Sequence, residues 1–141
     1  MSDKEFLEAF ESHAWPVGNW HHREHIKVAY LYLLRHPLEE ATAKMRTAVK
    51  SYNEVKQIPD SPTRGYHETM TIAWMHLACL TLCEYGPAEN ADSFFEQHPQ
   101  LSHNKNLGLF YSRDRFMSPQ AKIGFVEPDL APLPKSKKAK P

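Results

Sequence analysis

The stretch Trp20-His21-His22-Arg23-Glu24-His25 decides how the rest of the chain is interpreted. It places three of the nine histidines within five residues, at the start of a long segment rich in apolar side chains. Asn19, directly before it, is a residue that often caps a helix, and Pro37 cannot continue one. The sequence therefore predicts a buried helix from about residue 20 to residue 36.

The direction of each side chain on this helix follows from an advance of about 100° per residue. Glu24, Lys27 and Arg35 fall on one narrow stripe, which we expect to face solvent. His22 and His25 lie about 140° and about 160° from Lys27 and so point into the protein. Glu24 is then a surface charge, whereas the two histidines belong to the interior.

A second histidine, His67, opens another such segment together with Glu68. Residues 66–85 are apolar nearly all round, which indicates a central helix, and Gly86 ends it. The segment between them, residues 38–56, repeats apolar side chains at three-and-four spacing, as an amphipathic bundle helix does. Because short connections make neighbouring helices antiparallel, the helix starts near residues 22 and 67 should lie at the same end of a bundle.

The shared end predicts a metal site formed by His22, His25 and His67. Residues at positions i and i+3 of a helix can share one ligand, and His21 is an alternative partner for His25 at i+4. The partial positive charge at a helix start favours neutral imidazole, which is the form that binds metals. Three histidines with an open position are typical of a catalytic metal. The ligand set suits zinc, copper, nickel or iron and does not choose among them.

Other polar residues are candidates for roles beside the metal. Glu68 is a candidate general base, a hydrogen-bond acceptor for a ligand histidine, or a fourth ligand. Tyr111, Arg113 and Arg115 close a helix expected over residues 104–116 that would return to the same end of the bundle. A tyrosine or arginine there would hold the anionic group of a substrate.

The remaining segments complete an all-α, single-domain helical bundle of four main helices. A capping box of Ser2 and Glu5 opens a first helix that reaches about residue 13. Short C-terminal helices are expected over residues 88–97 and 118–125. We expect the bundle domain to span residues 1–126, and residues 127–141, rich in proline and lysine, to form an extended, partly disordered tail.

Composition excludes several classes of function. The formal net charge is zero, which argues against a nucleic-acid-binding surface. No apolar run approaches the roughly 20 residues needed to span a bilayer, and the N-terminus does not resemble a signal peptide. Cys79 and Cys83 are four apart on an expected helix, so we interpret them as reduced core residues. We therefore expect a cytoplasmic protein that does not bind membranes.

Several segments resemble a family of small bacterial all-helical proteins. They are the stretch from Trp20 to Leu33, residues 65–71 (GYHETMT), Tyr111-Ser112 and residues 128–134 (PDLAPLP). The resemblance covers nearly the whole chain and implies a bacterial origin, but it transfers no activity. More loosely, the chain resembles small helical bundles that bind a metal through three histidines, which is an analogy of fold alone.

These observations predict a small metal-dependent enzyme acting on a small molecule, by hydrolysis or oxygen chemistry. A metal-free form would use a His-Glu pair for acid–base work. A metal-binding or sensing protein without turnover and a metal-free helical interaction module are the alternatives.

Overall fold

The computed structural model describes residues 1–135 of the 141-residue chain, and they form helices joined by loops and turns. No strand occurs within that range, so the all-α prediction is confirmed. The α-helices are α1 (Asp3–Glu11), α2 (His22–Leu33), α3 (Leu38–Val55), α4 (Glu68–Tyr85), α5 (Ala91–Gln97), α6 (Arg113–Phe116) and α7 (Pro119–Ile123). Short 3₁₀ helices are η1 (Val17–Asn19), η2 (Pro99–Leu101) and η3 (Asn104–Leu109).

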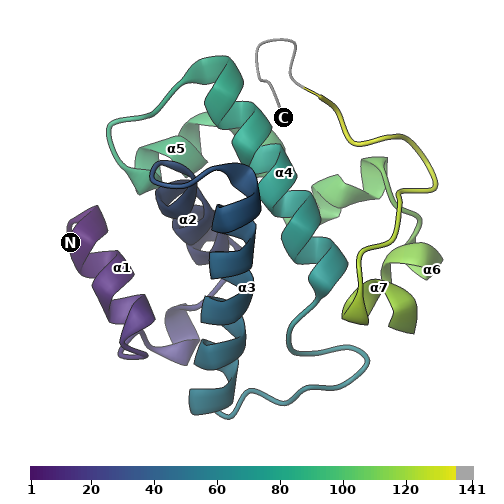
Figure 1. The fold of residues 1–141 in the computed structure, drawn as a ribbon, viewed down its shortest axis with the longest axis horizontal. Coiled ribbons are helices and arrows are strands. Elements are labelled where there is room, and N and C mark those ends of the chain that lie inside the picture. Colours follow the sequence, from purple (N-terminus) through teal and green to yellow (C-terminus); the bar gives the residue numbers. More distant parts are fainter. Residues whose placement is uncertain (136–141) are drawn as a thin grey trace.

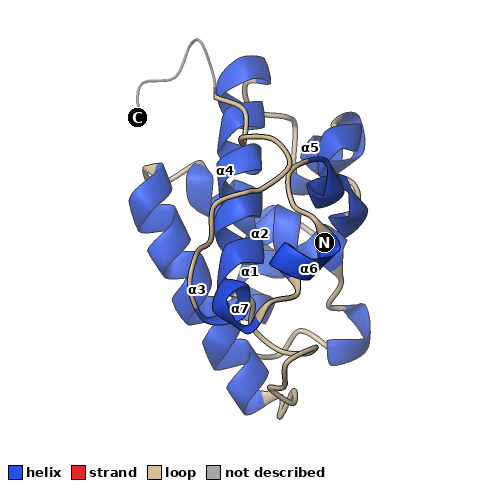
Figure 2. Cartoon of the chain, turned by 90° about the vertical axis from the view of Figure 1, so that its right-hand side faces the viewer, coloured by secondary structure: helices blue, strands red, loops and turns tan. Residues whose placement is uncertain are grey.

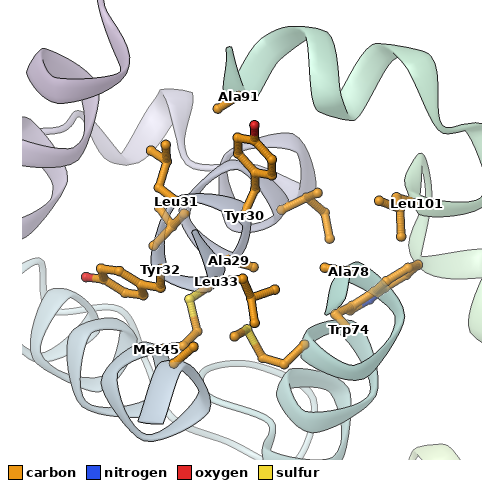
Figure 3. Packing of buried hydrophobic residues seen from close by; sticks show 14 of the residues in the cluster. Ala29, Tyr30, Leu31, Tyr32, Leu33, Met45, Trp74, Ala78, Ala91 and Leu101 are labelled. Carbon is orange, nitrogen blue, oxygen red and sulfur yellow. The ribbon is translucent and has the colours of Figure 1, made fainter. Parts of the chain in front are cut away.

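Helix α2 lies at the centre of the fold, in contact with α1, α3, α4 and α5 (Figure 1). Every residue from Ile26 to Leu33 is buried, so the helix has no solvent-facing stripe over that length. Figure 3 shows side chains leaving α2 in several directions, with Tyr30 pointing toward Ala91 of α5 and Tyr32 pointing away from it. The α2 helix therefore organises the core from within, because it buries apolar surface against four neighbours.

Lys27 corrects the expectation that it faces solvent, because its residue is only 7% exposed. Its ammonium lies 4.0 Å from the ring centroid of Phe6 and 3.1 Å from a carboxylate oxygen of Asp92. Arg23 donates to the same carboxylate oxygen at 2.8 Å. Burial of a lysine costs free energy unless the charge is paired. The acidic partner that makes this burial possible comes from α5, 65 residues along the chain, and periodicity could not reveal it.

Helices α2, α3 and α4 form a compact three-helix unit in which each packs against the other two. Figure 1 shows the chain descending along α3 and returning upward along α4, as the predicted antiparallel order requires. The short helix α7 packs against the lower part of α4 (Figure 2). Because α2, α3 and α4 alternate in direction, the starts of α2 and α4 lie at the same end of the unit.

Residues 127–135 contain no helix, and they dock on the bundle. The backbone N–H of Leu130 donates to the Phe110 carbonyl at 2.8 Å, and the ring of His76 bonds the Pro134 carbonyl at 2.6 Å. Leu133 packs against the core. The rest of the tail predicted to be partly disordered, residues 136–141, lies outside the described residues.

Several predicted boundaries were wrong. Helix α2 begins at His22 rather than Trp20, because residues 17–19 form the separate η1 turn, and α4 begins at Glu68. The helix expected over residues 104–116 is broken into η3 and α6, since Ser112 caps a new helix through its hydroxyl. Cys83 is exposed and therefore not a core residue, whereas Cys79 is half-buried; both thiols are free. No helix within the described range is long and apolar enough to span a membrane.

Candidate functional site

The two helix starts are built by histidines at their N-cap positions. His21, not Asn19, is the N-cap of α2, and the Glu24 carboxylate accepts its backbone N–H at 3.0 Å. His67 is the N-cap of α4, where its Nδ1 accepts the backbone N–H of Met70 at 3.0 Å. A side-chain acceptor at this position satisfies an N–H group that has no partner inside the helix. These two residues therefore begin the helices on which the site is built.

Both ring nitrogens of His67 are used within the protein. Its Nδ1 caps α4, and its Nε2 donates to the Phe116 carbonyl at 2.8 Å. The ring also stacks on Phe116, with centroids 4.5 Å apart. Burial lowers the pKa of the imidazole, which agrees with a neutral ring that donates at one nitrogen and accepts at the other. A metal bound to His67 would replace one of these two hydrogen bonds.

His22 is held by one hydrogen bond and one aromatic contact. Its Nε2 donates to the Leu101 carbonyl at 2.7 Å, and its ring lies 4.7 Å from that of Trp74. Burial lowers the pKa of His22, so the neutral ring keeps a lone pair on Nδ1. The indole N–H of Trp74 donates in turn to the Asn104 side chain at 2.8 Å, which fixes the face that His22 contacts.

His25 differs from both because its ring has no hydrogen-bond partner in the described part of the chain. It is half-buried, its ring centroid lies 4.2 Å from that of Trp20, and it lines two pockets. Burial, and secondarily the neighbouring His22, lower the pKa of His25 to about 3. The ring is therefore neutral, with one N–H donor and one acceptor nitrogen left for a ligand.

His25 lines two cavities near the end of the bundle where α2 and α4 begin. The inner cavity, of about 60 Å³, lies between α2, α3 and α4, and His22 and Trp74 also line it. The outer pocket, of about 260 Å³, is more open, and His67 lines it. His25, Met70 and Thr71 line both spaces. The structure thus brings the three predicted histidines around adjoining cavities, with His25 common to both.

The residues that line these two cavities include no Asp or Glu. The first turns of α2 and α4 contribute residues to the lining, and the partial positive charge of a helix start favours a negative ligand over a cation. Among residues 1–135, no group of three His, Cys, Asp or Glu side chains is arranged to hold a metal ion. The three-histidine metal site therefore stays a prediction.

Glu68 is engaged with neighbouring side chains. Its two carboxylate oxygens accept from the Arg46 guanidinium at 2.9 and 2.7 Å, and Tyr66 donates to it at 2.6 Å. The hydrogen bonds from Arg46 are the main reason that the pKa of Glu68 is lowered. A carboxylate held in its charged form by two donors is a weak base. This arrangement favours a structural role, joining α3 to the start of α4.

The residues expected from the C-terminal part line neither cavity. The Tyr111 hydroxyl donates to the Val126 carbonyl at 2.7 Å, and the residue is 2% exposed. Arg115 donates to the Glu127 carbonyl at 2.8 Å, and both it and Arg113 are exposed on α6. Both hydrogen bonds join C-terminal segments to one another, and neither involves a residue of α2.

Two polar residues of the outer pocket were missed by the sequence reasoning. Asn53 lies on α3, and Arg64 lies in the loop before Gly65. Arg64 is exposed, and its guanidinium makes no ion pair within the described residues. The one sequence feature that could have indicated Arg64 as a site residue is its position three residues before His67.

Comparisons with known proteins supply no further assignment: no family model matches the chain, and neither a curated protein nor a solved structure matches it.

Proposed function

We propose that this protein binds a small organic anion, a carboxylate, in the outer pocket and acts on it through His25. The observation that carries the proposal is the neutral ring of His25, which makes no hydrogen bond within residues 1–135 and lines both cavities. His25 is half-buried, and a ring nitrogen that the protein leaves unbonded at a pocket wall can bind a ligand.

The charges around the pocket support an anion. Arg64 and Asn53 line the pocket; the first carries a guanidinium and the second an amide with two N–H groups. Each helix start adds about 0.3–1 kcal/mol of favourable interaction with a negative group. The absence of acidic residues from the lining removes the repulsion that a carboxylate would otherwise meet. Guanidinium binds carboxylate in a two-point geometry, which would orient the ligand.

The apolar part of the outer pocket supports an organic ligand rather than a bare inorganic ion. Val17, Trp20, Val49 and Met70 line it beside the polar groups. A mixture of apolar walls with a few placed polar groups is the usual composition of a small-molecule site.

Ligand binding would change the chemistry available at His25. In the free protein its pKa of about 3 makes it a poor base at neutral pH. A carboxylate close to the ring stabilises imidazolium and raises the pKa toward the range where histidine exchanges protons. The ligand thus completes the acid–base group that would act on it. This assigns to His25 the acid–base role expected of the metal-free form, with no part for Glu68.

The metal-dependent enzyme remains a second proposal. His22 and His25 both line the inner cavity as neutral imidazoles, and His67 lines the adjoining pocket. One specific requirement distinguishes it: His67 must give up a hydrogen bond to Phe116 or to Met70 to join the ion.

The carboxylate proposal is tested by following histidine ring nitrogens by NMR during titration with acetate, butyrate, benzoate and inorganic phosphate. We expect a carboxylate to shift the ring signals of His25. Arg64→Gln should weaken binding about tenfold or more, because a hydrogen bond to a charged group is worth about 1.5–3 kcal/mol. Arg35→Gln, which removes an exposed arginine outside both cavities, is the matched control.

The proposal is overturned if none of these anions perturbs the His25 ring at millimolar concentration. It is also overturned if Arg64→Gln and Arg35→Gln weaken binding equally, because the effect would then reflect net charge alone.

A further inference from the structure

The inner cavity has a size and lining that differ from those of the outer pocket. Its volume is about 60 Å³, and its walls include Ile26, Ala29, Met45 and Met75, each less than 5% exposed. A cavity of about 150 Å³ is needed to hold benzene. The inner cavity is therefore too small for an aromatic ring and suits about two or three carbon atoms.

The two spaces share three lining residues. Met70 and Thr71 line both, as does His25. Methionine is unbranched and flexible, so a rotation of the Met70 side chain would open a passage between the two cavities without moving the helix. A ligand in the outer pocket can therefore extend an apolar end past the imidazole into the inner cavity.

We infer that the ligand is a short-chain aliphatic carboxylate whose alkyl end fills the inner cavity while its carboxylate stays beside Arg64 in the outer pocket. This inference rests on the proposed function and deepens it, because it names the substrate class. The imidazole of His25 then lies beside the carbon atoms between the two ends.

The affinity of unbranched acids should follow their length. Each added methylene that enters an apolar cavity increases affinity about fourfold, the equivalent of about 0.8 kcal/mol. The increase should stop once the alkyl end has filled the inner cavity. Benzoate should bind more weakly than the best alkyl acid, because its ring does not pass into the cavity.

Two substitutions in the cavity wall should move the preferred length in opposite directions. Ala29→Val adds two methyl groups to the wall and should shorten the preferred acid, with about tenfold loss of affinity for the acid that binds wild type best. Ile26→Val removes one methyl group and should lengthen the preferred acid by about one carbon. Ala48→Val, which places valine at a half-buried site of α3 outside both cavities, is the matched control.

The experiment is calorimetric titration of wild type and variants with acids from acetate to octanoate and with benzoate. Thermal unfolding of each variant verifies that it is folded, and Ile26→Val keeps the test available if Ala29→Val does not fold. Opposite shifts in preferred length, with none in Ala48→Val, support the inference. Affinity that does not depend on length, benzoate as the tightest ligand, or unshifted preferences in both variants overturns it.

The same data separate this inference from the proposed function. Binding that depends on Arg64 but not on chain length leaves the carboxylate site standing and removes only the role of the inner cavity. If no acid binds at all, both are overturned.

Discussion

Acidification should destabilise this protein through His25. Its pKa is about 3 in the folded state, against 6.5 for an unperturbed histidine. The unfolded chain therefore takes up this proton first as the pH falls. The stabilising contribution is fully present above about pH 6.5 and is lost progressively down to about pH 3. Between these pH values the unfolded state binds a proton at His25 and the folded state does not, so acidification favours unfolding.

The size of the effect follows from the difference between the two pKa values. Between about pH 7 and about pH 5, His25 alone should lower the free energy of unfolding by about 2 kcal/mol. By about pH 3 the loss approaches about 5 kcal/mol. A typical domain has a free energy of unfolding of only about 5–15 kcal/mol, so the effect is large enough to measure well before unfolding is complete.

The assay is urea denaturation at several pH values from neutral to about pH 5. His25→Gln removes the titrating group, and His21→Asn is the control, because it replaces an exposed histidine while keeping a good N-cap side chain. His22 and His67 also have lowered pKa values, but they contribute to wild type and variants alike.

We expect His25→Gln to lose about 2 kcal/mol less stability than wild type on acidification, and His21→Asn to follow wild type. Parallel curves for wild type and His25→Gln would refute the reasoning, since the ring would then be free to take up a proton in the folded state.

Three further predictions concern the loop, the ion pair and the metal. Gly65→Ala should destabilise the protein by about 1 kcal/mol or more and weaken carboxylate binding, because Gly65 has φ +91° and an added Cβ would lie 2.7 Å from an Asp60 carboxylate oxygen. Urea denaturation measures the stability and titration measures the binding. A variant as stable as wild type contradicts this prediction. Arg46→Met should raise the pKa of Glu68 and cost about 1–3 kcal/mol, measured by side-chain NMR and denaturation; an unchanged Glu68 titration would show that the pair is not what lowers its pKa. The three-histidine metal hypothesis requires about one equivalent of transition metal in protein purified without a histidine tag and its loss in His67→Ala; less than about a tenth of an equivalent contradicts it.

Much of the fold could be read from local signals. The capping box at Ser2 and the three-and-four apolar spacing of α3 both lie within short stretches of chain, and each formed as predicted. Such signals are local because a cap or an amphipathic face is completed by residues within one or two turns. Lys27 shows where this reasoning ends, since a charge on an apparent solvent stripe became buried once α5 supplied Asp92.

The sequence by itself determined that His22, His25 and His67 gather near one end of a helical bundle, because helix order and short connections are local properties of the chain. Only the tertiary structure decided which imidazole stays available. The Leu101 carbonyl, 79 residues from His22, and the Phe116 carbonyl, 49 residues from His67, occupy the other two rings. Every residue carries such a carbonyl, so no sequence pattern marks the one that will accept a hydrogen bond. Within the part of the chain that the structure describes, His25 is the one of these three histidines whose ring makes no hydrogen bond, and this therefore depends on packing between distant segments.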